Sequence, residues 1–244
     1  MSGEPYFLVD RMPGTGGFRL TGAEGRHAAT VRRLRVGESL VLTDGSGGFA
    51  EATVTQVARG ELTVDVGPGQ RSDPPDVRVT LVQALPKGDR GELAVELATE
   101  AGVDALVPWS AARCVTRWTA DRAEHGVQRW RTTAMQAAKQ SRRPFVPAVA
   151  ELAGTPAVAE LIKRSSTALV LHESASASLR ATELPARGDV VLIVGPEGGL
   201  TEEELTVFRT AGAVAVRLGP QVLRTSTAGA VALGALGVLT GRWT

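Results

Sequence analysis

The sequence predicts an α/β protein in which a small β-rich domain precedes a larger domain built on a parallel sheet. Up to about residue 66, short runs rich in β-branched residues alternate with glycine-containing turns. From residue 77 onward, continuous apolar runs alternate with segments of helical periodicity, as expected for strands buried on both faces of a parallel sheet. Between the two patterns, Pro68, Pro74 and Pro75 interrupt helices and central strands alike. We therefore predict domains at 1–72 and 73–244.

The composition is that of a folded globular protein. Hydrophobic residues make up 43% of the 244 residues and charged residues 22%, which argues against long disorder. The single cysteine, Cys114, excludes an internal disulfide and fits a reducing compartment as a small, partly buried thiol. The first ten residues lack the pattern of a signal peptide, and the apolar segment 228–239 is too short to span a bilayer. We expect a cytoplasmic protein with no membrane segment.

In the first domain, four strands and one helix are predicted. Ala28, Val31 and Leu34 recur at helical spacing within 23–34. The strands cover 6–9, 39–43, 49–57 and 61–66. Short strands separated by glycine turns are typical of a barrel or a sandwich.

In the second domain, strands and helices alternate. The predicted strands cover 77–85, 105–109, 168–171, 190–194 and 214–218. The predicted helices cover 89–101, 121–141, 156–164, 201–211 and 227–239. The last helix is apolar nearly all round, so it lies in the core or at a subunit interface.

A glycine-rich turn follows the strand at 190–194. It reads Gly195-Pro196-Glu197-Gly198-Gly199, and a helix follows it, which is typical of a ligand crevice at the carboxyl edge of a parallel sheet. The spacing matches neither a P-loop nor G-x-G-x-x-G, so ATP and NAD are poorly supported. An ordinary tight turn remains the alternative.

The acidic residues beside this turn have a structural explanation. Thr201 and Glu204 form a capping-box pattern, and Glu202 and Glu203 lie where a helix dipole favours negative charge. Glu197 lies inside the turn and is left as a candidate for a polar role.

A second Gly-Pro turn follows the strand at 214–218. Gly219 and Pro220 are followed by the hydroxyl cluster Thr225, Ser226 and Thr227, from which we expect a helix N-cap. If the two strands were neighbours, both turns would line one crevice that suits a neutral, adenosine-like ligand.

Charge is balanced overall but locally clustered. Lys+Arg number 27 against 26 Asp+Glu, so no global field attracts nucleic acid, and only three of the basic residues are lysines. Clusters at the domain edges would fit a groove that binds RNA phosphates, whereas solvated surface is the plainer interpretation. The basic residues and one histidine proposed to contact RNA are Arg26, His27, Arg32, Arg33, Arg35, Lys87, Arg90 and Arg143. Lys139, Arg142 and Arg143 form one of these clusters, at the end of the predicted helix 121–141. The three histidines are too scattered to indicate a metal site, and we expect no metal.

Several segments together resemble one family. In order along the chain they are His27–Glu38, Gln83–Arg90, Ala98–Val103, Gln140–Arg142, Gly195–Gly199 and Leu218–Thr225. They resemble the RsmE-type 16S ribosomal RNA uridine N3-methyltransferases of the SPOUT superfamily, and their order over nearly the whole chain makes the resemblance specific.

The resemblance implies a fold, a donor and a target. The fold would be a PUA-like RNA-binding β-barrel over 1–72 and a SPOUT-type parallel-sheet domain with a trefoil knot over 73–244. The methyl donor would be S-adenosylmethionine, and the target the uridine conventionally numbered 1498 in 16S rRNA of the small ribosomal subunit. The protein would be a homodimer with active sites at the subunit interface.

The resemblance also implies site residues. It assigns the adenosine pocket to Leu171, His172, Gly195, Gly198, Gly199, Leu218, Leu223 and Thr225. Arg142 and Arg224 are candidates to stabilise charge on the uridine, and Glu197 is a candidate proton acceptor. The chain departs from the family at Gln136, Lys139 and Ser226, where glutamates are often found.

Three other functions remain open at this stage. One is a non-catalytic RNA-binding assembly factor, and another is a SPOUT methyltransferase that acts on a different RNA. The third is a small-molecule enzyme that uses a nucleotide at the glycine turns. Methyl transfer with turnover would exclude the non-catalytic factor. The identity of the methylated nucleoside would show whether a different RNA is the target. Preference for a phosphorylated nucleotide over S-adenosylmethionine would indicate the small-molecule enzyme.

Overall fold

A computed structural model describes residues 3–243, and the chain divides into two compact units. The first unit comprises Met1–Pro74 together with Ala138–Val146, and the second comprises Pro75–Ala137 and Pro147–Thr244. The division falls two residues after the predicted boundary. Nothing in the sequence pattern indicated that 138–146 would pack with the N-terminal residues.

The first unit is a six-stranded mixed sheet. Its order is β1-β3-β4-β5-β2, with β6 paired to β4; β1 and β3 are parallel, and the other pairs are antiparallel. The strands are β1 (Tyr6–Leu8), β2 (Gly16–Leu20), β3 (Ser39–Thr43), β4 (Gly48–Ala58), β5 (Glu61–Val66) and β6 (Gln70–Arg71). The four predicted strands are therefore confirmed.

The sequence pattern did not indicate β2, for a physical reason. Its five-residue segment begins with two glycines, which have no side chain to pack and are depleted in strands, so only Phe18, Arg19 and Leu20 are left to show a strand pattern. The core of the unit comes mainly from the central strands and includes Phe7, Leu40, Leu42 and Val64.

The predicted helix at 23–34 is two shorter elements. α1 (Gly22–Arg26) passes directly into one turn of π-helix (His27–Val31). Gly25 allows α1 to pack closely, because a Cβ placed there would lie 2.3 Å from the carbonyl oxygen of Leu20.

The second unit is a six-stranded sheet in which all strand pairs are parallel. The order is β12-β10-β11-β7-β8-β9. The strands are β7 (Val77–Ala84), β8 (Ala105–Trp109), β9 (Ala148–Val149), β10 (Thr167–Leu171), β11 (Gly188–Val194) and β12 (Val214–Val216). The predicted parallel sheet is confirmed; the additional strand β9 has only two residues.

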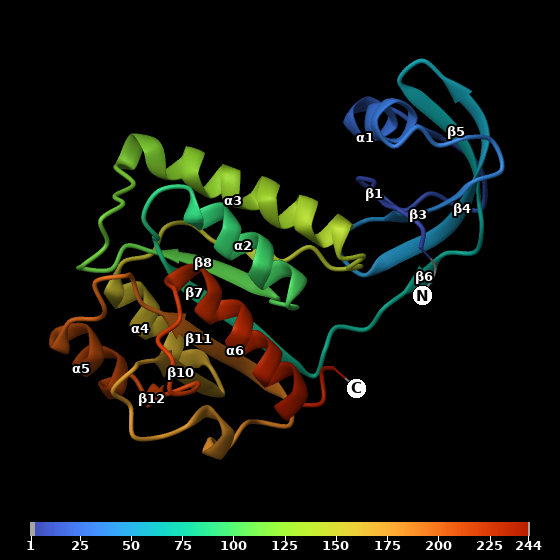
Figure 1. The fold of residues 1–244 in the computed structure, drawn as a ribbon. Helices are drawn as coiled ribbons and strands as arrows, with labels where there is room; N and C mark the ends of the chain where they lie inside the picture. The colour runs from blue at the N-terminus through green and yellow to red at the C-terminus, as the bar shows by residue number, and fades with distance from the viewer. Residues whose placement is uncertain (1–2, 244) are drawn as a thin grey trace. The chain divides into compact units, whose positions relative to one another are not determined.

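Helices cover both faces of this sheet. Figure 1 shows α2 and α6 together on one face, where α6 also contacts β7 and β11, and α4 and α5 together on the other. The helices are α2 (Arg90–Glu100), α3 (Ala120–Gln140), α4 (Thr155–Arg164), α5 (Glu202–Thr210) and α6 (Thr225–Leu239), with one 3-10 turn at Leu179–Ala181.

The apolar helix α6 contributes to the core, which confirms one of its two predicted roles. Ala232, Leu233 and Leu236 are buried against the sheet. Val231 and Val238 remain 45% and 70% exposed, so α6 also presents an apolar edge.

The two Gly-Pro turns follow strands that have one other strand between them. The strands before the two Gly-Pro turns, β11 and β12, are not neighbours, because β10 pairs with both. All three strands are parallel, so their carboxyl ends still lie along one edge. After β12 the chain returns to place α6 against β7 and β11. The trefoil knot stays a prediction. Within residues 3–243, no helix is long and apolar enough to cross a membrane.

Candidate functional site

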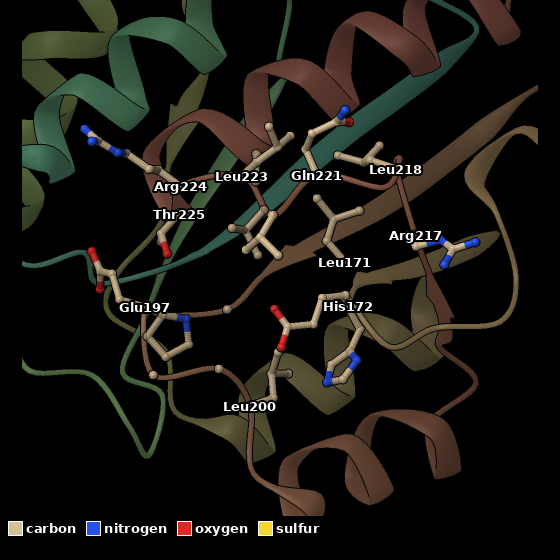
Figure 2. Close-up of a pocket in the computed structure, with 18 of the residues that line it drawn as sticks. Leu171, His172, Glu197, Leu200, Arg217, Leu218, Gln221, Leu223, Arg224 and Thr225 are labelled. Atoms are coloured by element: carbon tan, nitrogen blue, oxygen red, sulfur yellow. The ribbon is translucent and has the colours of Figure 1, made fainter.

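A pocket lies at the carboxyl edge of the second unit's sheet. Its volume is about 680 Å³, within the range of pockets that bind small molecules. Most of its wall comes from the segments that follow β10, β11 and β12. Figure 2 shows apolar side chains such as Leu171, Leu218 and Leu223 gathered around one space, with polar groups toward its ends.

The structure brings most of the predicted site residues to this pocket. All eight residues assigned to adenosine binding line it, namely Leu171, His172, Gly195, Gly198, Gly199, Leu218, Leu223 and Thr225. Glu197 and Arg224 line it as well. Arg142 is not among the lining residues and belongs to the segment of the first unit that ends at Val146. The roles of these residues remain predictions.

The first Gly-Pro turn exposes backbone to the pocket. The Gly199 N–H donates to the Pro196 carbonyl at 2.9 Å, and Gly199 has φ +71°, where a side chain would be strained. A Cβ on Gly195 would lie 2.6 Å from Leu200 Cδ1. Glycine at 195 therefore lets the Leu200 side chain pack against the backbone of the turn.

The helix that follows this turn is capped as predicted. The Glu204 N–H donates to Thr201 Oγ1 at 3.2 Å, and Glu204 Oε2 accepts from the Thr201 N–H at 3.0 Å, which completes a capping box. Glu204 is buried, and its other oxygen accepts from the Ala112 N–H at 2.8 Å. The carboxylate therefore also ties the loop after β8 to the start of α5.

Glu197 joins the turn to the loop after β7. Its Oε1 accepts a hydrogen bond from the Lys87 N–H at 3.1 Å. The loop after β8 joins the same group, because Thr116 Oγ1 donates to the Pro86 carbonyl at 2.7 Å. Loops from three parallel strands are thus linked at this edge.

The second Gly-Pro turn leads into α6, and here one expectation is wrong. The N-cap is Arg224, which is extended and makes no side-chain capping bond; Thr225 is the first helical residue. The hydroxyls of Thr225 and Ser226 are therefore buried inside the first turn of α6 instead of capping it. The Thr227 and Ala228 N–H groups donate to the Arg224 carbonyl at 2.8 and 2.9 Å. The first two N–H groups of a helix have no partner within it, so this end of α6 offers donors beside the pocket.

Two side chains on the pocket wall have defined hydrogen bonds. His172 Nδ1 accepts a hydrogen bond from the Ser174 N–H at 3.2 Å. Arg113 Nη1 donates to the carbonyls of Gly198 and Leu200 at 3.1 and 3.2 Å. No sequence motif had marked Arg113 as a site residue. Its position just after the strand at 105–109, at the carboxyl edge, was the available signal.

The proposed RNA-contacting residues divide between the two units. Arg26, Arg32, Arg33 and Arg35 are exposed on the first unit, to which His27 and Arg143 also belong; Lys87 and Arg90 are exposed on the second. His27 packs edge-on against Phe7, with ring centroids 5.8 Å apart. Burial, followed by the charge of Lys139, lowers the pKa of His27.

Lys139 does not belong to an exposed basic cluster, as the sequence had suggested. Its side chain is 6% exposed, and Nζ lies 2.6 Å from Glu24 Oε1 within the first unit. A buried, paired ammonium group is not available to RNA.

Two arginines have unusual backbone. Arg33 and Arg142 have φ values of +56° and +57°, and they are the two non-glycine residues with positive φ among residues 3–243. Each follows the end of a helical segment, where glycine is the usual residue. A residue other than glycine costs stability at such a position. This cost is consistent with selection of the two arginine side chains for a property other than stability.

A parallel sheet with a glycine-lined pocket at its carboxyl edge is typical of enzymes that bind a nucleotide-like molecule. A family model described as an RNA methyltransferase domain matches residues 73–237, and one described as an RNA methyltransferase PUA domain matches residues 20–67. The first match covers more than half of the chain. The chain belongs to this RNA methyltransferase family.

Particular relatives narrow the comparison. The chain is 51% identical to the Ribosomal RNA small subunit methyltransferase E of Mycobacterium tuberculosis, over 97% of this chain and 92% of the relative. It is 30% identical to the protein of the same name from Bacillus subtilis, over 91% and 90%. It also resembles a solved structure of the Neisseria gonorrhoeae protein of that name bound to S-adenosyl methionine, with TM-score 0.86, 30% identity and coverage of 97% and 98%.

Proposed function

We propose that this protein transfers a methyl group from S-adenosylmethionine to N3 of a uridine in 16S rRNA of the small ribosomal subunit, at the position conventionally numbered 1498. The observation that carries the proposal is the convergence of all eight predicted adenosine-binding residues on one pocket. The similarity to small-subunit rRNA methyltransferases over nearly the whole chain supports the target.

The pocket fits S-adenosylmethionine in size and in chemistry. It combines apolar side chains such as Leu171, Leu218 and Leu223 with the bare backbone of the glycine turn. Apolar walls suit the adenine ring, and backbone N–H and C=O groups suit its polar edge. Glu173, Glu202 and Arg217 also line the pocket and offer charged partners for an amino-acid tail.

The protein's part in the reaction is alignment and charge stabilisation. Bound in the pocket, S-adenosylmethionine would supply a methyl group already activated by its sulfonium. Arg224, on the pocket wall, and Arg142 are proposed to stabilise negative charge on the uridine oxygens as the N3 proton leaves. Glu197 is a candidate acceptor of that proton, and water or backbone groups are the alternatives.

The first unit is proposed to hold the RNA. It matches an RNA methyltransferase PUA domain, and it carries Arg26, Arg32, Arg33 and Arg35 on its surface. Arginine suits bidentate contact with phosphate. Reversing the charges of Arg32 and Arg33 should weaken RNA binding and leave affinity for S-adenosylmethionine unchanged.

The protein is further proposed to act as a homodimer in the cytoplasm. The apolar edge formed by Val231, Val238 and Leu239 of α6 would be covered by a second copy. Sedimentation of Val238→Asp tests this; a wild-type monomer at micromolar concentration would contradict it.

The decisive experiment offers labelled S-adenosylmethionine to small ribosomal subunits that lack the modification, and then identifies the labelled nucleoside by mass. Label in 3-methyluridine at the predicted position supports the proposal. Label in another nucleoside or RNA assigns a different target. Binding of S-adenosylmethionine without transfer to any RNA favours a non-catalytic RNA-binding factor, and preference for a phosphorylated nucleotide favours a small-molecule enzyme.

A further inference from the structure

Arg113 makes contacts that neither the capping of α5 nor the proposed chemistry explains. Its Nη1 donates to the Gly198 carbonyl at 3.1 Å and to the Leu200 carbonyl at 3.2 Å. These two carbonyls lie on either side of Gly199, whose positive φ sets the direction of the turn. One guanidinium group therefore spans the part of the turn where the backbone is most flexible.

The backbone that carries Arg113 is itself held on both sides. The Ala112 N–H donates to the buried Glu204 carboxylate at 2.8 Å, and its carbonyl accepts from Arg117 Nη2 at 2.9 Å. On the other side, Cys114 is 4% exposed, and its N–H donates to the Ala111 carbonyl at 3.1 Å. Arg113 thus projects from a fixed segment toward a flexible one.

The fit between the two segments is close. A Cβ on Gly198 would lie 3.2 Å from Arg113 Cβ and 3.4 Å from the Arg113 carbonyl oxygen. Gly198 therefore packs against the backbone of Arg113 while the guanidinium reaches past it to the Leu200 carbonyl. Gly198 and Gly199 both line the pocket.

We propose that Arg113 is a positioning residue, which fixes the glycine turn at 195–200 in its ligand-binding conformation through the carbonyls of Gly198 and Leu200. The inference rests on the proposed function for the identity of the ligand. Holding the turn before the ligand arrives reduces the conformational entropy lost on binding, so Arg113 acts on affinity through the turn and touches no reacting atom.

The alternative is direct contact with the carboxylate of the ligand's amino-acid tail, since Arg113 lines the pocket. Two ligands separate these roles. S-adenosylhomocysteine carries the amino-acid tail, whereas 5′-methylthioadenosine lacks it. A positioning residue affects both ligands equally, and a carboxylate partner affects only the first.

The experiment measures the affinity of both ligands by calorimetry for the full-length wild type, Arg113→Gln, Arg113→Lys and the control Arg164→Gln. Arg164 is matched because its Nε also donates to a backbone carbonyl of the second unit, that of Glu160 at 3.1 Å, and it does not line the pocket. Hydrogen exchange at 195–200 is followed without ligand. For Arg113→Gln we expect about tenfold weaker binding of both ligands, the equivalent of one hydrogen bond to a charged group. Exchange in the turn should be faster, and Arg113→Lys should restore part of the affinity.

Steady-state kinetics on the RNA substrate should show a raised KM for S-adenosylmethionine with little change in kcat. Unchanged affinity and exchange in Arg113→Gln would overturn the proposal, as would a loss confined to S-adenosylhomocysteine or an equal loss in Arg164→Gln. If the wild type binds neither ligand, the proposed function fails instead. The exchange rates at 195–200 then still decide whether Arg113 holds the turn.

Discussion

Lys139 Nζ lies 2.6 Å from Glu24 Oε1, and this ion pair joins the end of α3 to α1 within the first unit. The Lys139 and Glu24 side chains are 6% and 19% exposed. The second Glu24 oxygen accepts from the Leu8 N–H at 3.1 Å, so the pair also reaches β1. The contact gives a structural reason for a lysine at position 139.

Removal of one partner should destabilise the first unit more than removal of both. Lys139→Met leaves a largely buried carboxylate unpaired, which we expect to cost about 2 kcal/mol of unfolding free energy. Glu24→Gln should cost a similar amount. In the double variant the two losses should not add, because no charge is left unpaired. Denaturation followed by far-UV circular dichroism measures this, and additive losses would show that the two side chains are not coupled.

Arg33 and Arg32 provide a matched test of backbone strain on the first unit. Arg33 has φ +56°, whereas Arg32 has φ −75°, and both side chains are exposed. Arg33→Gly should raise the unfolding free energy by about 1 kcal/mol, because glycine adopts positive φ without strain. Arg32→Gly removes the same charge from helical backbone and should lower it by about 0.5 to 1 kcal/mol. Both should weaken RNA binding, which gel-shift titration measures. A loss of stability in Arg33→Gly would contradict the strain argument.

His27 should make the first unit less stable in mild acid. Burial lowers the pKa of His27 below its ordinary value of 6.5, with further lowering by Lys139 and Arg32 and opposition from Glu24. Just below pH 6.5 the unfolded chain therefore binds more protons at this residue than the folded chain does. Unfolding free energy thus rises with pH in this range, so the contribution is complete above pH 6.5 and is lost as the pH falls toward the folded pKa.

The measurement is unfolding free energy against pH for the wild type and His27→Gln. The variant has no titrating ring, so we expect a shallower decline between about pH 7 and about pH 5. Parallel curves would mean that His27 has the same pKa in the folded and unfolded chain.

A partly buried ion pair anchors the end of α6 in the second unit. Arg242 Nη1 donates to Asp104 Oδ2 at 2.6 Å and also to the Val77 carbonyl, and Nη2 donates to the Gly102 carbonyl at 2.6 Å. Arg242→Gln should lower the unfolding free energy by about 2 kcal/mol, because it leaves Asp104 unpaired. All four tryptophans belong to this unit, so their fluorescence reports its unfolding.

The control for Arg242 is another arginine pair of the same unit. Arg187 Nε lies 3.4 Å from Asp76 Oδ1, and the two side chains are 81% and 67% exposed. Arg187→Gln should change the unfolding free energy by less than about 0.5 kcal/mol, since exposed pairs contribute little. Equal losses in both variants would indicate a general effect of reduced charge.

The second unit was the more predictable from sequence because its strands are buried on both faces. Runs such as Val190–Val194 are continuously apolar, and the turn after them is marked by glycine and proline. The order of the strands was not predictable, because periodicity describes each strand alone and carries no information about which strand lies beside it. The sequence therefore did not show that β10 lies between β11 and β12.

In the candidate site, too, local patterns could be predicted from the sequence and contacts between distant residues could not. Glycine turns and the capping box are local patterns, so the turn at 195–199 and the capping role of Glu204 could be recognised from the sequence. The contacts of Arg113 and Lys139 join residues more than 80 positions apart in sequence, and no local pattern indicates such partners. The hydroxyl cluster at Thr225 was misassigned because Arg224, an uncommon N-cap residue, precedes the helix.

Glu197 has two possible contributions, and two substitutions separate them. Its Oε1 accepts from the Lys87 N–H, a bond that the side-chain carbonyl of glutamine can keep and alanine cannot. If Glu197 accepts the N3 proton, as proposed, Glu197→Gln should lower kcat by about a hundredfold or more with little change in KM for S-adenosylmethionine. Glu197→Ala should show the same loss in kcat and, in addition, a raised KM, because the loops after β7 and β11 are no longer joined there. Steady-state kinetics on small subunits measure kcat and KM, and single-turnover methyl transfer measures the rate of the chemical step without product release. Wild-type rates in Glu197→Gln, with a loss only in Glu197→Ala, would remove Glu197 as the proton acceptor and leave it the role of joining the two loops.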